Sequence, residues 1–123
     1  MRIDLDPGDD SSIQINAYEN QRIQIDSEWY EQNIMIYGKK VTSWPVESLD
    51  KLTESDLSEL IASKPEIILF GTGDQLILLN QKLQYILLSN DIGVEFMTTQ
   101  AACRTYNILA SEGRRVLACL VLA

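Results

Sequence analysis

Histidine is missing from this chain of 123 residues. Histidine is the general base of Ser-His-Asp triads and the commonest protein ligand of zinc and related metals. Its absence argues against triad hydrolases and against histidine-ligated metal sites. We therefore expect no metal and no cofactor, assign no catalytic residue, and lean towards a protein that is not an enzyme.

Cysteine is scarce as well. Cys103 and Cys119 lie sixteen positions apart, which is not the spacing of a metal-binding or redox pair. Cys103 could serve as a nucleophile near the start of a helix, where the pKa of a thiol is lowered. Because no histidine is available as its base and its surroundings are apolar, we favour the core for Cys103, and we place Cys119 in the core too.

Long apolar runs and clustered positive charge are also absent. No stretch approaches the ~18 apolar residues that suggest a membrane span, and the acidic start of the chain lacks the layout of a signal peptide. We expect a cytoplasmic protein that does not bind a membrane. The net charge of −8 opposes binding to phosphate backbones, so nucleic acid is not an expected partner.

The negative charge is concentrated in the first quarter of the chain. Residues 1–31 hold eight acids and two bases, a net charge of −6, which leaves −2 for all the rest. Such a segment is either a solvated face that aids solubility or a docking surface for a basic protein partner. The sequence leaves both open.

What is present fits one domain spanning residues 1–123. Apolar residues make up 46% of the chain and charged residues 23%, as in ordinary globular proteins. Residues 1–10 are polar, contain Pro7-Gly8, and are expected to form a loose lead-in.

The front of the chain has the pattern of β-hairpins. Apolar and polar residues alternate at 13–16 and 23–26, on either side of a polar turn. A second pair of strands is expected at 33–37 and 39–43, around Gly38. Trp44-Pro45 ends this pattern, because the residue before proline is disfavoured in a helix.

The remainder alternates between helices and strands. Thr53 or Ser55 can cap a helix that runs to about Ala62, Asn80 can cap a second, and Thr98 or Thr99 a third that runs to Glu112. Apolar strands are expected at 67–70, 94–97 and 116–122, with a further brief strand at 76–79. This order predicts an α/β fold: a single compact domain with a parallel β-α-β-α-β core and added N-terminal antiparallel β-strands.

In such a sheet, ligands bind beyond the carboxyl ends of the strands. Gly71, Thr72 and Gly73 follow a buried strand, and the third helix brings Arg104 and Asn107. These five residues are the candidate ligand-binding site, where backbone amides, the helix dipole and the guanidinium could hold an anion. The alternative is structural: a tight turn at 71–73, and a helix locked in place by its polar side chains.

Aromatic residues mark the front strands. Trp29, Tyr30 and Trp44 lie at the edges of predicted β segments. Any of them left exposed would indicate a protein-binding patch. The sequence does not distinguish a core position from an exposed one here.

Several segments together resemble a known family. They are residues 65–73, 92–97, 101–109 and 112–115, and the block Ala-Cys-Arg-Thr-Tyr-Asn at 102–107 is the most specific. This chain resembles the domain-of-unknown-function family that includes mitochondrial respiratory complex I assembly factor 3 and its small bacterial and archaeal relatives. The resemblance implies a compact domain with a β-α-β-α-β core, and a non-enzymatic assembly role for the mitochondrial member.

Two functions remain in contention. The favoured hypothesis is a non-enzymatic protein-binding or complex-assembly module, whose protein partner is unidentified. The alternative is a small anionic-ligand site or enzyme at the strand ends near Gly71-Thr72-Gly73 and Arg104. A homodimer through the exposed edge of the front strands is compatible with either, since strand edges invite pairing.

Overall fold

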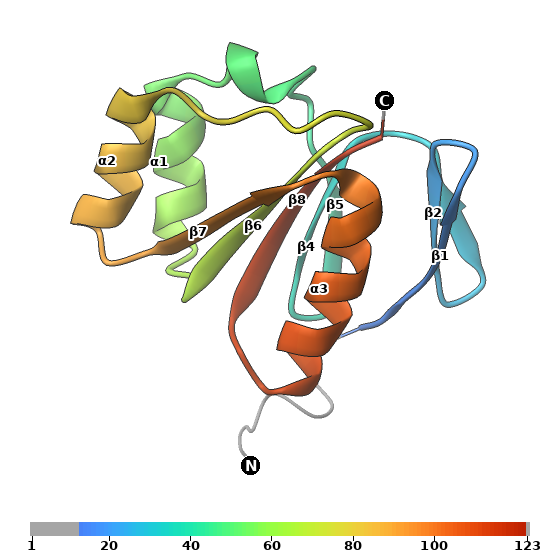
Figure 1. Ribbon diagram of the computed structural model, residues 1–123. Helices are drawn as coiled ribbons and strands as arrows, with labels where there is room; N and C mark the ends of the chain where they lie inside the picture. Colours follow the sequence, from blue (N-terminus) through green and yellow to red (C-terminus); the bar gives the residue numbers. More distant parts are fainter. Residues whose placement is uncertain (1–12, 123) are drawn as a thin grey trace.

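The computed structural model describes residues 13–122, so the loose lead-in expected at 1–10 lies outside the described residues. Two β-sheets and three α-helices make up this part of the chain (Figure 1). The first three strands, β1 (Ile15–Glu19), β2 (Arg22–Ile25) and β3 (Glu28–Tyr30), form a small antiparallel sheet. The predicted front hairpin is confirmed, and β3 extends it by a strand too short for the alternation of its residues to predict.

The second sheet has five strands in the order β5-β4-β8-β6-β7. The strands β4 (Ile34–Tyr37) and β5 (Lys40–Ser43) form a hairpin, and β4 also pairs antiparallel with β8 (Val116–Val121). The strand β6 (Ile67–Thr72) lies parallel to both β8 and β7 (Gly93–Met97). The α/β fold, with its parallel core and added antiparallel strands, is therefore as the sequence predicts.

The two crossovers place helices on opposite faces of this sheet. One leads from β6 through α2 (Gln81–Ser89) to β7, and the other from β7 through α3 (Thr99–Ser111) to β8 on the far side of β6. Because such crossovers are right-handed, helices that step in opposite directions along a sheet cover opposite faces. Figure 1 shows α1 (Glu54–Ala62) beside α2, whereas α3 lies on the other face near β1 and β2.

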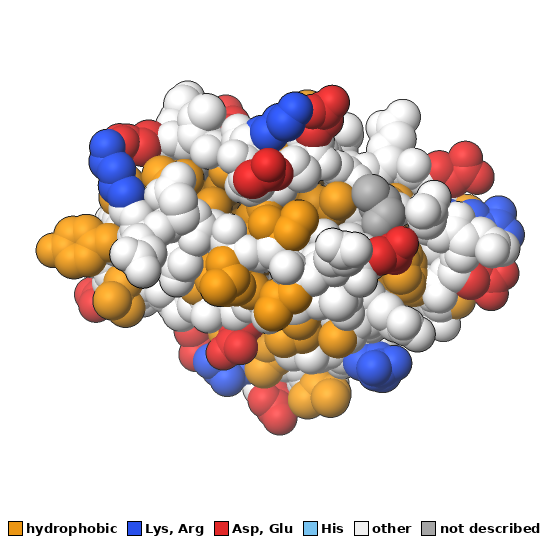
Figure 2. Space-filling model, turned by 45° about the horizontal axis from the view of Figure 1, so that its top comes forward, with side chains coloured by type: hydrophobic (Ala, Val, Ile, Leu, Met, Phe, Trp, Pro, Cys, Tyr) orange, Lys and Arg blue, Asp and Glu red, His pale blue; other side chains and the backbone are white. Residues whose placement is uncertain are grey.

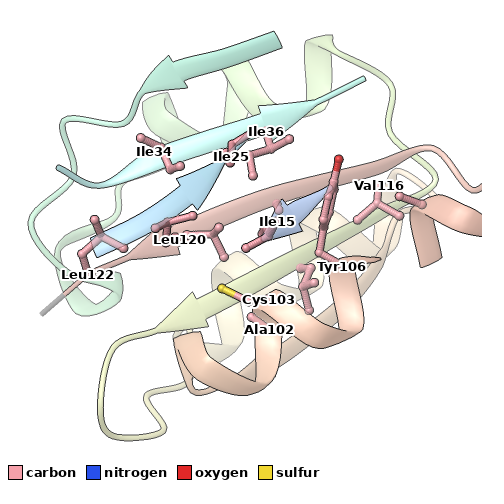
Figure 3. Packing of buried hydrophobic residues seen from close by; sticks show 14 of the residues in the cluster. Ile15, Ile25, Ile34, Ile36, Ala102, Cys103, Tyr106, Val116, Leu120 and Leu122 are labelled. Carbon is pink, nitrogen blue, oxygen red and sulfur yellow. The ribbon is translucent and has the colours of Figure 1, made fainter. Parts of the chain in front are cut away.

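The core is accordingly double. Alternate residues of β6 face opposite ways: Ile67 and Leu69 join the cluster under α3, while Ile68 and Phe70 join the cluster under α1 and α2. Figure 3 shows the first cluster, where Ile15 and Ile25 of the small sheet meet Tyr106 of α3. Every residue of β6 is buried, which explains its continuous apolar run.

The helix starts agree with the sequence. Thr53 caps α1 in a capping box with Asp56, the Asn80 side chain accepts a hydrogen bond from the Leu83 amide, and Thr98 caps α3. A short 3₁₀ turn, η1 (Leu49–Lys51), precedes α1. The caps were predictable because their chemistry is local to one turn of chain.

The brief strand predicted at 76–79 is wrong. The chain from Gln75 to Asn80 carries no strand. The Thr72 hydroxyl donates to the Gln75 carbonyl (2.6 Å) and accepts from the Ile77 amide (3.2 Å). These bonds turn the chain away from β6, whose two sides are already paired with β7 and β8.

Candidate functional site

The end of β6 lies so close to α3 that it requires glycine, and so does the turn that follows. A methyl group on Gly71 would lie 2.9 Å from Leu120 Cδ2 and 3.1 Å from both Ala102 Cβ and Thr99 Cα. Gly73 has a φ of 92°, which side-chain-bearing residues rarely adopt. Both glycines thus have structural reasons to be present.

Polar groups of this turn are bonded within the protein. The Gly73 amide donates to Thr99 Oγ1 (2.8 Å), and the Thr99 amide donates to the Gly73 carbonyl (3.0 Å). The Thr99 hydroxyl in turn donates to the Val121 carbonyl, and its side chain is fully buried. An anion at this turn would have to compete with Thr99 for the Gly73 amide.

The other two predicted site residues lie elsewhere, at the seam between α3 and β1. The Ile15 amide donates to Asn107 Oδ1, and Asn107 Nδ2 donates to the Ile15 carbonyl, each at 2.8 Å. Asn107 therefore acts like a strand partner and locks α3 to β1. Arg104 is exposed, and with Asn107 it lines a hollow of about 230 Å³ that Gly71, Thr72 and Gly73 do not line.

Both cysteines are buried, as expected for core residues. Burial raises the pKa of the Cys103 thiol to about 12, although the nearby Arg104 guanidinium lowers it in part. Burial also raises the pKa of Cys119. A thiolate nucleophile requires a lowered pKa, so this environment disfavours the nucleophile interpretation of Cys103.

Four exposed apolar side chains lie on α2 or in the segment that leads to it. Tyr85 and Leu88 are 70% and 68% exposed, and Leu76 and Leu78, in the segment that leads to α2, are 59% and 58% exposed. We call these four residues the α2 surface. Among the large hydrophobic residues of the described chain, Ile108 on α3 is the remaining exposed one. Figure 2, which brings the top of Figure 1 forward, shows several hydrophobic areas on this face, one of them at its left-hand edge, with charged side chains around and between them.

A shallow groove continues the α2 surface towards β7. It has a volume of about 360 Å³, and Tyr85 and Leu88 form one wall while Ile92, Gly93 and Val94 form the other. A signal for this surface existed in the sequence. Leu83 and Leu87 form the apolar face of α2 that packs on the core. Tyr85 and Leu88, three residues apart, lie outside that face.

The aromatic residues of the front strands divide into two kinds. Trp44 is buried with its ring 6.3 Å from that of Phe70. Trp29 and Tyr30 are half-buried, and the Arg22 guanidinium lies 4.0 Å from the centre of the Trp29 ring. Glu28 and Glu31 of the acidic segment are exposed, whereas its residues Asp9 and Asp10 lie outside the described residues.

No helix within residues 13–122 is long and apolar enough to cross a bilayer. In the same part of the chain, no three acidic or cysteine side chains gather as metal ligands would.

Comparison with known proteins places this architecture. The model of the family described as "Protein of unknown function (DUF498/DUF598)" matches residues 15–121. A crystal structure from Bordetella parapertussis superposes with a TM-score of 0.83 at 36% identity, covering 92% of this chain and 98% of that one.

The similarity also extends to named proteins. The "13 kDa major membrane protein" of Francisella tularensis is 32% identical over 77 residues, 63% of this chain and 62% of that protein. NADH dehydrogenase (ubiquinone) 1 alpha subcomplex assembly factor 3 of Homo sapiens is 30% identical over 112 residues, 89% of this chain and 61% of that protein. The chain thus spans less than two thirds of either relative. It belongs to the DUF498/DUF598 family of proteins of unknown function, and its relatives include an assembly factor of NADH dehydrogenase.

Proposed function

We propose that this chain is a non-enzymatic protein-binding module that assists the assembly of a larger complex. The observation that carries the proposal is the α2 surface, where Leu76, Leu78, Tyr85 and Leu88 are all more than half exposed. Large apolar side chains left exposed next to one another are typical of protein interaction sites, and Tyr85 and Leu88 line one groove together. Tyrosine is also among the residues that contribute most to binding free energy at such sites.

The relatives support the same proposal. The human relative is named an assembly factor, and an assembly factor must bind other proteins. Because the chain spans only 61% of that relative, the identity of the complex is not carried over.

The exposed acids of the front strands offer a second contact with a partner. Glu28 and Glu31 are exposed on or beside β3, so a basic patch on the partner would be attracted to them. Reversal of Asp9, Asp10, Glu28 and Glu31 to lysine should weaken the partner's binding without unfolding the domain. Undiminished binding by that folded variant would remove the acids from the proposal.

The experiment that tests the proposal is a tagged pull-down from the extract of the native host. A protein captured by the wild type in stoichiometric amount should be lost with the double variant Tyr85→Ser, Leu88→Ser. Ile108→Ser is the matched control, because Ile108 is also exposed (58%) but lies on α3, across the sheet. Capture that survives the double variant, or that is lost equally with Ile108→Ser, would contradict the assignment of the α2 surface.

A small anionic ligand is the alternative candidate, and Arg104 is the observation in its favour. Its exposed guanidinium stands beside a hollow of about 230 Å³ that Gln100 and Tyr18 also line. Under this alternative, the purified domain releases an anionic small molecule, and Arg104→Ala loses it. An unchanged affinity for that molecule in Arg104→Ala would exclude this site.

A further inference from the structure

A second groove, unrelated to α2, lies between the two sheets. It has a volume of about 390 Å³, and Trp29, Tyr30 and Glu31 form one side of it while Ile34, Val41 and Ser43 form the other. The strand β5, which supplies Val41 and Ser43, is the outermost strand of the five-stranded sheet. The groove therefore runs along an open sheet edge.

The register of the hairpin shows which backbone groups of β5 face this groove. Thr42 lies opposite Met35 and Lys40 opposite Tyr37, while the Trp44 amide donates to the Asn33 carbonyl (2.8 Å). Hydrogen-bonded and non-hydrogen-bonded pairs alternate in an antiparallel ladder. The amides and carbonyls of Lys40, Thr42 and Trp44 thus point to β4, and those of the two residues between them point outwards.

The outward groups belong to Val41 and Ser43. Among the described residues, no hydrogen bond from another element reaches the backbone of either. Two residues in succession on that side supply two donors and two acceptors, the pattern that an added strand uses.

The opposite wall is aromatic and only partly used by the core. Tyr30 packs against the cluster under α3 and donates to Glu28 Oε1 (3.1 Å). Trp29 belongs to neither core cluster nor to the residues packed against them. The Arg22 guanidinium lies over the Trp29 ring, and Trp29 also lines the groove. A held, half-buried tryptophan is a typical anchor of a binding site.

We propose that this groove binds an extended segment of a partner protein, which adds to the sheet as a strand antiparallel to β5. An apolar side chain of the segment packs between Trp29 and Val41. A basic residue near its N-terminal end faces Glu31, because Ile34, three residues after Glu31, pairs with Ser43 at the end of β5. At the opposite end, Lys39 and Lys40 lie where the C-terminal part of the segment passes, which favours an acidic residue there.

Two observations favour such a segment over a second copy of this chain. The edge of β5 is four residues long, and a pairing of that length buries far less than the roughly 1,000 Å² that a stable dimer needs. The chain also carries a net charge of −8, which opposes association with a second copy of itself. The homodimer predicted from the exposed edge of the front strands would use this same edge if it formed through β5, so it is one outcome of the test below.

The test starts from a display library of random peptides selected against the wild-type protein. The variant Trp44→Phe leaves Trp29 as the only tryptophan, so its fluorescence reports binding at the groove. Enriched peptides should carry an apolar residue preceded by a basic one, change the Trp29 fluorescence, and shift the NMR amide resonances of Val41 and Ser43. Only every second amide of the bound peptide would donate a hydrogen bond to β5. N-methylation of that set of amides should therefore abolish binding, and N-methylation of the other set should not.

Variants of the groove then give the size of each contact. Trp29→Ala and Ser43→Pro should each lower the affinity for the peptide by about tenfold or more, as loss of a central anchor does. Ser43→Ala is the matched control and should bind normally, because only proline removes the outward amide. Proline is tolerated at an edge position whose amide faces outwards, so Ser43→Pro should still fold.

Three results would overturn the proposal. The first is a library with no sequence enriched over a blank selection. The second is a set of enriched peptides that shift the NMR amide resonances of Tyr85 and Leu88 instead of those of β5. Enriched peptides that bind with equal affinity to the wild type, Trp29→Ala and Ser43→Pro would count in the same way. The third is a protein that sediments as a dimer whose interface is β5, which would make a second copy the occupant.

Discussion

The turn after β6 and the α2 surface are close in sequence but opposite in construction. At the turn, Gly73 and Thr99 bond to each other, Thr99 also bonds to β8, and the Thr72 hydroxyl bonds to Gln75 and Ile77. At the α2 surface, Tyr85 and Leu88 are left in water and belong to neither core cluster. The comparison shows that the polar residues of the turn, which resemble a ligand site in sequence, stabilise the fold. The exposed apolar residues of the α2 surface are the ones available to bind another protein. Substitutions in the two regions should therefore have opposite consequences.

The largest expected loss of stability is for Thr99→Val. Valine keeps the volume but leaves the Gly73 amide and the Val121 carbonyl without their partner in a buried place. Loss of the buried bonds should lower the free energy of unfolding by about 3 kcal/mol, as measured by urea titration. Thr105→Val, half-buried on the same helix, should change it by less than about 0.5 kcal/mol. If Thr99→Val and Thr105→Val lowered the free energy of unfolding equally, the hydrogen bonds of Thr99 would not contribute to stability as described.

Gly71→Ala is expected to cost about 2 kcal/mol, because overpacking forces Leu120 or α3 to move. Thermal unfolding followed by circular dichroism gives the shift in melting temperature. Gly93→Ala is the control: its added methyl group would have no neighbour closer than 3.6 Å. A Gly71→Ala protein as stable as Gly93→Ala would mean that α3 does not lie as close to β6 as described.

Asn107→Ala is expected to cost about 1.5 kcal/mol, since two hydrogen bonds to Ile15 are lost. Hydrogen exchange should also become faster at the Ile15 amide. Arg104→Ala, one turn earlier on α3, should leave both the stability and the exchange rate unchanged. Faster exchange in Arg104→Ala alone would contradict the role given to Asn107.

The smallest effect on stability belongs to the α2 surface. Tyr85→Ser and Leu88→Ser each remove an exposed side chain and should change the free energy of unfolding by no more than about 0.5 kcal/mol. The same two changes are those expected to abolish partner binding. A loss of several kcal/mol in either would place that residue in the core and remove it from the binding surface.

The sequence predicted what is decided locally. Of the candidate caps, Asn80 was predicted alone, whereas Thr53 was paired with Ser55 and Thr98 with Thr99; all three helices begin where expected because a cap bond spans one turn. The apolar run of β6 likewise marks a strand covered on both faces. It did not predict the path of residues 75–80, because that path depends on the Thr72 hydroxyl and on which strands already flank β6.

The candidate site shows the same division. The pattern of residues suggested one site containing Gly71, Thr72, Gly73, Arg104 and Asn107, but the structure spreads them between the strand end and the seam with β1. That separation depends on where β1 packs, 92 residues away from Asn107 in sequence. The sequence also could not tell that Trp44 is buried and Trp29 only half-buried, since each lies in or directly after a short strand.

The most direct test of the account is site-specific photo-crosslinking in cells of the native host. Benzoylphenylalanine placed at position 85 should yield a discrete adduct with a partner protein, and the same group at position 108 on α3 should not. Both positions are highly exposed, so exposure alone cannot produce the difference. An adduct at position 108 with none at position 85 would contradict the claim that the α2 surface is where this protein binds its partner.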